Sequence, residues 1–230
     1  MAILGTLRSC AGEEVVAGSW LDVGCGSGGI AGCLSHHVAS VTGVDPESWQ
    51  QWEELTTNRS NLHLHVGKFD GDDLPIKEAS FDVVVCNQVY EHVDNPELLL
   101  RNICHVLKPG GHCYFAGPNL LWPVKPHVYW PFVHWLPRDY SLRLMKALGS
   151  DRMSDLDAWS LDIWRLRSLI LRAGFNWKDA TPDRLKAGLA LRGSRSLMRA
   201  VTIMPRIVFR LLLPFSPGFV LILHKPAGNR

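Results

Sequence analysis

Short apolar runs alternate along the chain with longer stretches in which polar residues dominate or apolar residues recur at helical spacing. The run Phe81–Cys86 is rich in β-branched residues, which is typical of a buried strand. Asn95 followed by Pro96 predicts a helix start, because Asn caps helix N-termini and Pro is tolerated in the first turn. This alternation predicts an α/β fold, a Rossmann-like doubly wound sheet with helices on both faces. Strands are expected over residues 20–23, 40–44, 62–66, 81–86, 112–116, 176–180 and 219–224, and helices over 28–37, 47–59, 95–108 and 161–173.

The alternation is interrupted twice. Residues 120–158 combine many prolines with aromatic residues such as Trp122 and Trp130, too proline-rich for a regular element and too aromatic for a solvated linker. Residues 186–215 combine basic and apolar residues and are expected to be helical. We expect both segments to be insertions, after the fifth and the sixth strand, in a single domain spanning residues 1–230.

Charge and cysteine content narrow the function classes. The formal net charge is only +2, which argues against a nucleic-acid partner. The charge is uneven, because residues 184–230 carry nine Lys and Arg residues and neither Asp nor Glu. The six cysteines form no CxxC pair, and neither a secretory signal nor an uninterrupted bilayer-spanning run is visible. A cytoplasmic location is therefore expected.

A glycine cluster follows the first expected strand. Gly24, Gly26 and Gly29 fit the GxGxxG pattern, in which the backbone turns sharply and a ligand approaches closely. Asp45 ends the second strand, where an acid can bind the two hydroxyls of a ribose. These features suit both a dinucleotide such as NAD and an adenosyl ligand. Asp22 favours the adenosyl ligand, because a carboxylate there suits an ammonium group and suits a pyrophosphate poorly.

Further motifs follow in a fixed order: an acidic loop at residues 70–75, then Ser80–Val85, then Leu107–Gly111. Together with the glycine cluster they resemble the class I S-adenosylmethionine-dependent methyltransferases, specifically the small-molecule, methyltransferase type 11-like group, over residues 20–119. Beyond this point a looser likeness to members from polysaccharide and lipid pathways is carried by residues 125–138. The resemblance implies S-adenosyl-L-methionine as cofactor and about seven strands, the last of them antiparallel.

The resemblance also implies roles for residues of the glycine cluster and the second strand. Asp22 would help to hold the amino group of the cofactor. Gly24 and Gly26 would let the backbone approach its methionine and ribose portion, and Asp45 would take the ribose hydroxyls.

Later residues would complete the cofactor site. Asp70 and Gly71 would border the adenine, and Asn87 and Gln88 would line the opening through which the methyl group is transferred. Some ubiquinone-type O-methyltransferases bind a divalent ion here with an ExxEH motif. This chain has Gln88 in place of the first Glu, so no metal is expected.

Two histidines in the aromatic insertion are candidates for a general base. Methyl transfer depends mainly on alignment, but an oxygen nucleophile can also need a base with a pKa near neutrality. His127 and His134 lie where the acceptor should enter, and either fits this role. The alternative is that each is satisfied by a backbone carbonyl. The aromatic residues likewise form either an acceptor pocket or the core of the insertion.

The basic segment near the C-terminus has two interpretations. One is peripheral contact with the inner face of a membrane through residues 192–213, since a basic stripe on an apolar body suits a bilayer surface. The other is a helix whose apolar residues pack against the domain and whose basic face is solvated. Pro205 is expected to kink or divide the segment in either case. The stripe consists of Arg192, Arg195, Arg199, Arg206 and Arg210.

The leading hypothesis is a methyltransferase that moves a methyl group in line from S-adenosylmethionine to a small-molecule acceptor, or to one linked to a lipid or saccharide. One alternative is an NAD-dependent oxidoreductase, although the chain has no YxxxK pair to donate a proton. Another is a non-catalytic protein that binds S-adenosylmethionine. The acceptor atom (O, N or C) and the oligomeric state stay open.

Overall fold

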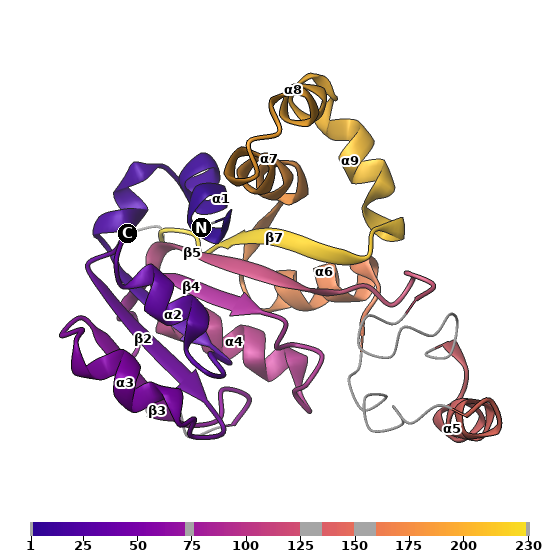
Figure 1. Ribbon diagram of the computed structural model, residues 1–230, viewed down its shortest axis with the longest axis horizontal. Coiled ribbons are helices and arrows are strands. Elements are labelled where there is room, and N and C mark those ends of the chain that lie inside the picture. Colours follow the sequence, from indigo (N-terminus) through magenta and orange to yellow (C-terminus); the bar gives the residue numbers. More distant parts are fainter. Residues whose placement is uncertain (1, 72–75, 125–134, 150–159, 229–230) are drawn as a thin grey trace.

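Seven strands form one sheet in the computed structural model, which describes residues 2–71, 76–124, 135–149 and 160–228 (Figure 1). The strands are β1 (Ser19–Val23), β2 (Ser40–Asp45), β3 (Leu62–Val66), β4 (Phe81–Asn87), β5 (Leu107–Pro118), β6 (Asn176–Asp179) and β7 (Gly218–His224). Their order in the sheet is β3-β2-β1-β4-β5-β7-β6. The first five pair in parallel, whereas β7 is antiparallel to both β5 and β6. The Rossmann-like sheet with an antiparallel last strand, expected from the sequence, is confirmed.

Helices cover the sheet on both faces (Figure 1). They are α1 (Ala2–Ala11), α2 (Gly29–Leu34), α3 (Gln51–Thr57), α4 (Pro96–Val106), α5 (Arg138–Ala147), α6 (Ile163–Arg172), α7 (Thr181–Leu191), α8 (Arg195–Ile203) and α9 (Arg206–Leu212), with 3₁₀ turns η1 (Glu13–Ala17) and η4 (Leu213–Phe215). The apolar residues of α4 and α6, such as Ile103 and Leu166, pack on one face of the sheet against Val84. Those of α1 and α2 pack on the other face, where Val85 belongs to their cluster. Neighbouring residues of β4 therefore pack into the cores on opposite faces of the sheet, because side chains alternate along a strand.

The capping prediction for α4 is confirmed. The Asn95 side chain accepts a hydrogen bond from the backbone N–H of Leu98 across 3.0 Å, and Pro96 occupies the first helical position. The strand after α4 is longer than residues 112–116, because β5 begins at Leu107 directly after the helix. The turn at Gly110 lies within β5, where its positive φ of 82° is reached at no steric cost.

The aromatic insertion falls partly outside the described residues. Its described parts include α5 and Trp135, whose indole N–H donates to the Leu120 carbonyl across 2.6 Å. His127 and His134 both lie outside the described residues. The structure therefore places neither of the two candidate bases.

The connection between β6 and β7 carries α7, α8, α9 and η4, which form an arch beside the sheet (Figure 1). It begins before the expected boundary at residue 186, because α7 already starts at Thr181. Pro205 divides α8 from α9, as expected. No residue of α8 or α9 is fully buried, so the expected burial of residues 197–213 against the domain is found in full only at Leu213, whereas Met198, Val201, Val208 and Phe209 are half-buried. The reason is that α8 and α9 contact α7 rather than lie on the sheet.

The arginine stripe is also interrupted. The guanidinium of Arg206 pairs with the buried carboxylate of Asp183 at 3.1 Å, so this residue belongs to a structural ion pair. Across the described parts of the chain, no helix has the length and apolar character needed to cross a membrane.

Candidate active site

The parallel strands bring the predicted site residues to one edge of the sheet. The last residue of β1 is level with Val44 of β2 and with Cys86 of β4. Gly24, Asp45 and Asn87 come next in the chain, so they meet at the carboxyl ends of the strands. In open α/β sheets, ligands bind at this edge.

The loop after β1 needs glycine for two different reasons. Gly24 has a φ of +66°, and a Cβ added there would lie 2.5 Å from Cγ2 of Val89. Gly26 has a φ of +50°, but an added Cβ would meet nothing within 4 Å. Gly24 is therefore required by packing and backbone together. Gly26 leaves an open side from which a ligand can approach the backbone.

Asp45 fastens this loop to the end of β2. One carboxylate oxygen, Oδ2, accepts from the Gly26 N–H at 2.8 Å. The other, Oδ1, accepts from the Glu47 N–H and the Trp49 indole N–H, both at 3.2 Å. A carboxylate has about four lone-pair sites, so these three bonds leave capacity for a further donor such as a hydroxyl.

Asp22 is the most unusual charged group of this edge. Its side chain is buried, and no hydrogen-bond partner among the described residues reaches its Oδ2 atom. Burial, with a smaller contribution from the charge of Asp45, raises the pKa of Asp22 to about 7, although a hydrogen bond with the Ala31 backbone acts in the opposite direction. A buried carboxylate oxygen without a partner is costly, and an incoming cation relieves that cost. The residues thus fit a ligand that carries an ammonium group at the glycine loop.

The third predicted segment is the loop after β3. The Asn102 side chain donates to the carbonyls of Phe69 and Gly71, at 3.0 and 2.9 Å, and fixes the loop backbone. The Asp70 carboxylate accepts from the Asp94 N–H at 3.2 Å. Asp70 and Gly71 are therefore held in place on the sheet side that carries α4.

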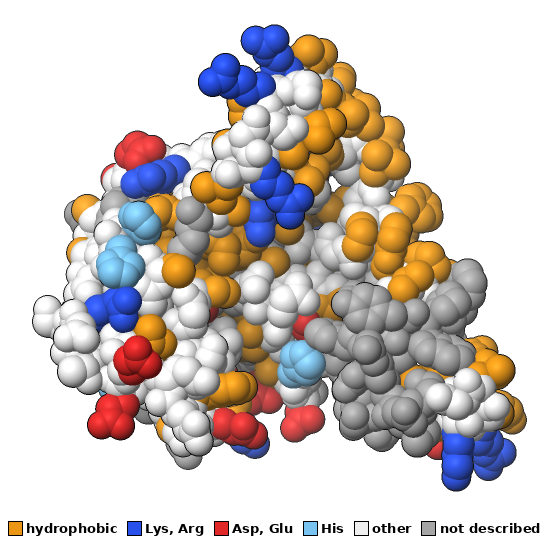
Figure 2. All heavy atoms as spheres, in the orientation of Figure 1, with side chains coloured by type: hydrophobic (Ala, Val, Ile, Leu, Met, Phe, Trp, Pro, Cys, Tyr) orange, Lys and Arg blue, Asp and Glu red, His pale blue; other side chains and the backbone are white. Residues whose placement is uncertain are grey.

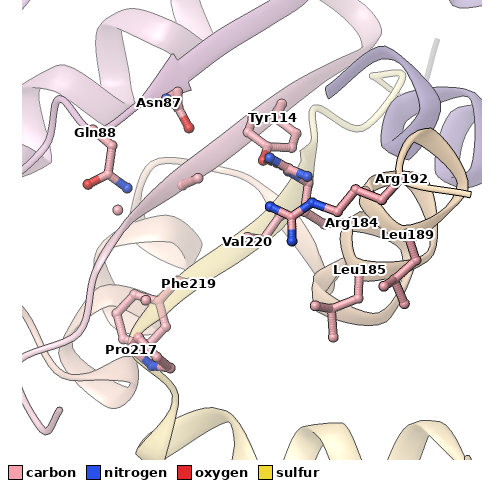
Figure 3. Close-up of a pocket in the computed structure, with 14 residues that line it drawn as sticks. Asn87, Gln88, Tyr114, Arg184, Leu185, Leu189, Arg192, Pro217, Phe219 and Val220 are labelled. Atoms are coloured by element: carbon pink, nitrogen blue, oxygen red, sulfur yellow. Dashed lines mark hydrogen bonds between the residues drawn. The ribbon is translucent and has the colours of Figure 1, made fainter. Parts of the chain in front are cut away.

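Asn87 and Gln88 line a cavity of about 480 Å³ (Figure 3). Gln88 has a φ of +60°, unusual for a residue with a side chain, and its N–H bonds to the Ala116 carbonyl at 2.8 Å. Strain of this kind occurs at functional sites, where the surrounding structure imposes it. The other lining residues, from β5, α7 and β7, are Tyr114, Ala116, Gly117, Arg184, Leu185, Gly188, Leu189, Arg192, Pro217, Gly218, Phe219 and Val220.

Glu91 lies directly behind one wall of this cavity. A Cβ added at Gly117 would come within 3.2 Å of Oε2 of Glu91. The Glu91 side chain is buried, neither of its oxygens has a partner among the described residues, and burial raises its pKa to about 7. His92, in contrast, is exposed. In the part of the chain that the structure describes, no three His, Cys, Asp or Glu side chains gather as a metal site.

Sequence reasoning missed the cavity wall formed by α7. Arg184, Gly188 and Arg192 recur every four residues, so they share one helix face. This spacing is a detectable signal, but the arginine pattern of the sequence also places Arg192 in a longer stripe that runs on through α8 and α9. Tyr114 was read only as part of a buried strand.

The strands and loops that carry the candidate site match a known protein family. Residues 21–115 match a family model described as "Methyltransferase domain". The matched residues contain the glycine loop, Asp45, the loop after β3, and β4 with the two residues that line the cavity.

Curated relatives carry a more specific name. A ubiquinone biosynthesis O-methyltransferase of Coxiella burnetii is 34% identical over 100 residues, which are 43% of this chain and 43% of that protein. A protein of the same name from Pseudomonas syringae pv. tomato is 32% identical over 152 residues, 62% of each chain. The chain thus spans less than two thirds of the length of these relatives.

Solved structures extend the likeness to the whole fold. An S-adenosylmethionine-dependent methyltransferase from Mesorhizobium loti superposes with a TM-score of 0.59 and 17% identity, covering 98% of each chain. At this identity the likeness concerns the architecture.

Proposed function

We propose that this chain, which carries a class I S-adenosylmethionine-dependent methyltransferase domain, transfers a methyl group from that cofactor to a small-molecule acceptor. One observation carries the proposal: Asp22 offers a buried carboxylate without a partner on Oδ2, beside a glycine loop that is open to a ligand. S-adenosylmethionine supplies an ammonium group that matches this carboxylate and a methyl group already activated on sulfur.

The glycine loop and the second strand hold one half of the cofactor in this proposal. Asp22 binds the amino group. The backbone at Gly24 and Gly26 lies against the methionine and ribose portion. Asp45 accepts from the ribose hydroxyls while keeping its bond to the Gly26 N–H.

The loop after β3 and the end of β4 complete the site. Asp70 and Gly71 border the adenine, and Asn102 supports this by holding the loop backbone. Asn87 and Gln88 stand between the cofactor and the cavity, which makes the cavity the place for the acceptor. Alignment of the acceptor atom with the methyl group then provides most of the catalysis.

The acceptor atom we propose is a hydroxyl oxygen. Two relatives at 34% and 32% identity are named O-methyltransferases. A hydroxyl must lose its proton during transfer, so a base with a pKa near neutrality accelerates the reaction. We assign this role to His127 or His134, which belong to the insertion after β5.

Calorimetry with S-adenosylhomocysteine and with NAD tests the cofactor assignment. We expect saturable binding of S-adenosylhomocysteine and no measurable binding of NAD, because a buried carboxylate repels a pyrophosphate. Tight NAD binding would favour the oxidoreductase. Release of S-adenosylhomocysteine from S-adenosylmethionine with a panel of phenolic acceptors tests catalysis. Binding without turnover across the panel would favour a non-catalytic binding protein.

The exposed apolar side of α8 and α9 supports a second part of the proposal, a peripheral contact with an anionic lipid bilayer. Figure 2 shows hydrophobic side chains along both helices and basic side chains at the α8 end. The chain has no Asp or Glu after Asp183, so nothing in this segment repels an anionic surface. Such contact would bring a lipid-linked acceptor to the cavity. The large exposed apolar residues are Leu197, Ile203, Met204, Ile207, Leu211, Leu212 and Phe215.

Sedimentation with vesicles tests the membrane contact. We expect binding to vesicles that contain phosphatidylglycerol, weaker binding to phosphatidylcholine alone, and loss of binding at high salt. Replacing Arg195, Arg199 and Arg210 together by Gln should abolish it, whereas the same change on α4 and α6, at Arg101 and Arg172, should not. Protein that stays in the supernatant at low salt contradicts the contact.

A further inference from the structure

Two guanidinium groups line the cavity next to Asn87. Arg184 lies in the first half of α7, and Arg192 caps its C-terminal end, two turns further along the same face. Figure 3 shows both side chains extending from α7 and lying close to each other beside the Tyr114 side chain. Two like charges close to each other repel, and an anion bound between them relieves that repulsion.

No protein carboxylate does so among the described residues. None of the residues that line the cavity is Asp or Glu. No carboxylate in the described ranges lies within 4 Å of the guanidinium nitrogens of Arg184 or Arg192, unlike the pair formed by Arg206 and Asp183. These two arginines therefore differ from the structural arginine on the neighbouring helix.

Contacts with neighbouring residues hold the Arg184 side chain in place. Its Nε donates to the hydroxyl of Tyr114 at 3.2 Å, and the tyrosine itself is buried. Its guanidinium also lies over Gly188, where an added Cβ would come within 3.3 Å of Nη1. The Nε bond uses one donor and leaves the Nη donors for a ligand, and a planar fork suits a carboxylate or a phosphate.

The remainder of the wall is apolar. Leu185 and Leu189 of α7 face the cavity from one side, and Phe219 and Val220 of β7 from another. A cavity with an apolar wall and a few convergent polar groups binds a ligand with an apolar body and one charged end. The amides of Asn87 and Gln88 lie across the same space from the side chains of α7 (Figure 3).

We propose that the cavity binds the acceptor by an anionic group, a carboxylate or a phosphate, that is held between Arg184 and Arg192, with the apolar body of the acceptor against Leu185 and Leu189. The anion fixes one end of the acceptor so that its other end reaches the opening at Asn87. This inference rests on the proposed methyl transfer for the identity of the ligand as acceptor, but not for the anion site itself.

Calorimetry on the full chain saturated with S-adenosylhomocysteine tests the proposal. The probes are benzoate, phenyl phosphate and the uncharged benzamide. We expect one or both anions to bind at least about tenfold more tightly than benzamide. The anion that binds more tightly shows whether the charged group of the acceptor is a carboxylate or a phosphate. Arg184→Gln and Arg192→Gln should each weaken anion binding by about tenfold or more. Arg195→Gln, on α8 outside the cavity, is the matched control and should change nothing.

Two readouts separate the possible failures. Affinity for S-adenosylhomocysteine should be the same in all three variants, and thermal unfolding should show that each folds. Equal binding of benzamide and the anions, or full anion binding by both cavity variants, overturns the anion site. Absence of S-adenosylhomocysteine binding, with anion binding that still depends on Arg184, overturns the proposed function and supports the anion site.

Discussion

The Asp45 carboxylate accepts a hydrogen bond from the backbone N–H of Gly26 at 2.8 Å, and this bond joins the end of β2 to the loop after β1. The residue proposed to bind the ribose thereby also sets the shape of the loop proposed to lie against the methionine portion. Two parts of the proposed cofactor site are therefore coupled through the Asp45 side chain.

Asp45→Ala should weaken S-adenosylhomocysteine binding by at least about tenfold, because it removes charge-assisted hydrogen bonds of roughly 1.5–3 kcal/mol each and a loop anchor. Calorimetry measures the change. Asp70→Ala should have a smaller effect, since Asn102 still holds the backbone of that loop. Unchanged affinity in Asp45→Ala would show that the ribose binds elsewhere.

Cofactor affinity should depend on the ionisation of Asp22. Its pKa is raised to about 7, and only the ionised carboxylate attracts an ammonium group. Affinity for S-adenosylhomocysteine should therefore rise roughly five- to tenfold between pH 6 and pH 7.5. Asp22→Asn should bind more weakly and lose most of this dependence. A wild-type affinity that is flat over this range would contradict a direct contact with the amino group.

Stability without ligand should change with pH in the opposite sense. The folded-state pKa of Asp22 is higher than the ordinary value of 3.8 for an aspartate, so folding favours its protonated form. That stabilisation is complete below about pH 3.8 and is lost as pH rises through about 7. Asp22→Asn should thus be more stable than the wild type by roughly 4 kcal/mol at most at pH 8 and by roughly 1.5 kcal/mol at pH 5, and similar to it only below about pH 3.8. Urea unfolding at the two pH values measures this. The pKa of Glu91 is raised in the same way, so the stability of Asp22→Asn should still fall somewhat as pH rises.

The two loop glycines should differ in their tolerance of alanine. Both substitutions place a side chain at positive φ, at a cost of roughly 1 kcal/mol. Gly24→Ala also drives a methyl group against Val89 and should lose roughly a further 1–3 kcal/mol from the free energy of unfolding. Gly26→Ala should remain folded but bind cofactor more weakly, because its methyl group occupies the open side of the loop. Similar unfolding midpoints for Gly24→Ala and Gly26→Ala would show that the Val89 side chain can move aside at little energetic cost.

His127→Ala should lower turnover roughly 10²–10⁴-fold if His127 removes the acceptor proton, with little change in cofactor affinity. Steady-state release of S-adenosylhomocysteine measures the effect, and His134→Ala is the matched variant. Full activity in both would rule out base catalysis by this segment. Glu91→Gln would then be the next variant, because Glu91 lies behind the cavity wall with a pKa near neutrality.

The sequence could predict the sheet because its evidence is local. The β-branched run of β4 and the Asn95 cap of α4 act over a few residues, and both appear where expected. The start of β5 was not predictable in this way. The sequence from Lys108 to Gly111 favours a turn, but Leu107 pairs with Phe81 of β4, and the Lys225 backbone, near the other end of the chain, bonds to Gly110 and Gly111.

The candidate site likewise combines residues whose positions could be predicted from the local sequence with residues whose environment could not. The glycine loop and Asp45 are adjacent to strand ends, so their meeting follows from parallel pairing. The burial of Asp22 and Glu91 arises from tertiary packing around them and has no signal in the local sequence. The cavity needs α7 to turn its arginines toward β5, and the charge pattern alone assigned Arg192 to a surface stripe.

The connection between β6 and β7 has a consequence for how the protein divides its tasks. The groups proposed to recognise the cofactor all lie between residues 22 and 88, whereas the arginines and leucines of the cavity lie within 184–192. Exchange of residues 181–217 alone would therefore alter which compound is modified without disturbing the methyl donor. Recognition of the methyl donor and recognition of the acceptor would then be carried by separate segments of the chain.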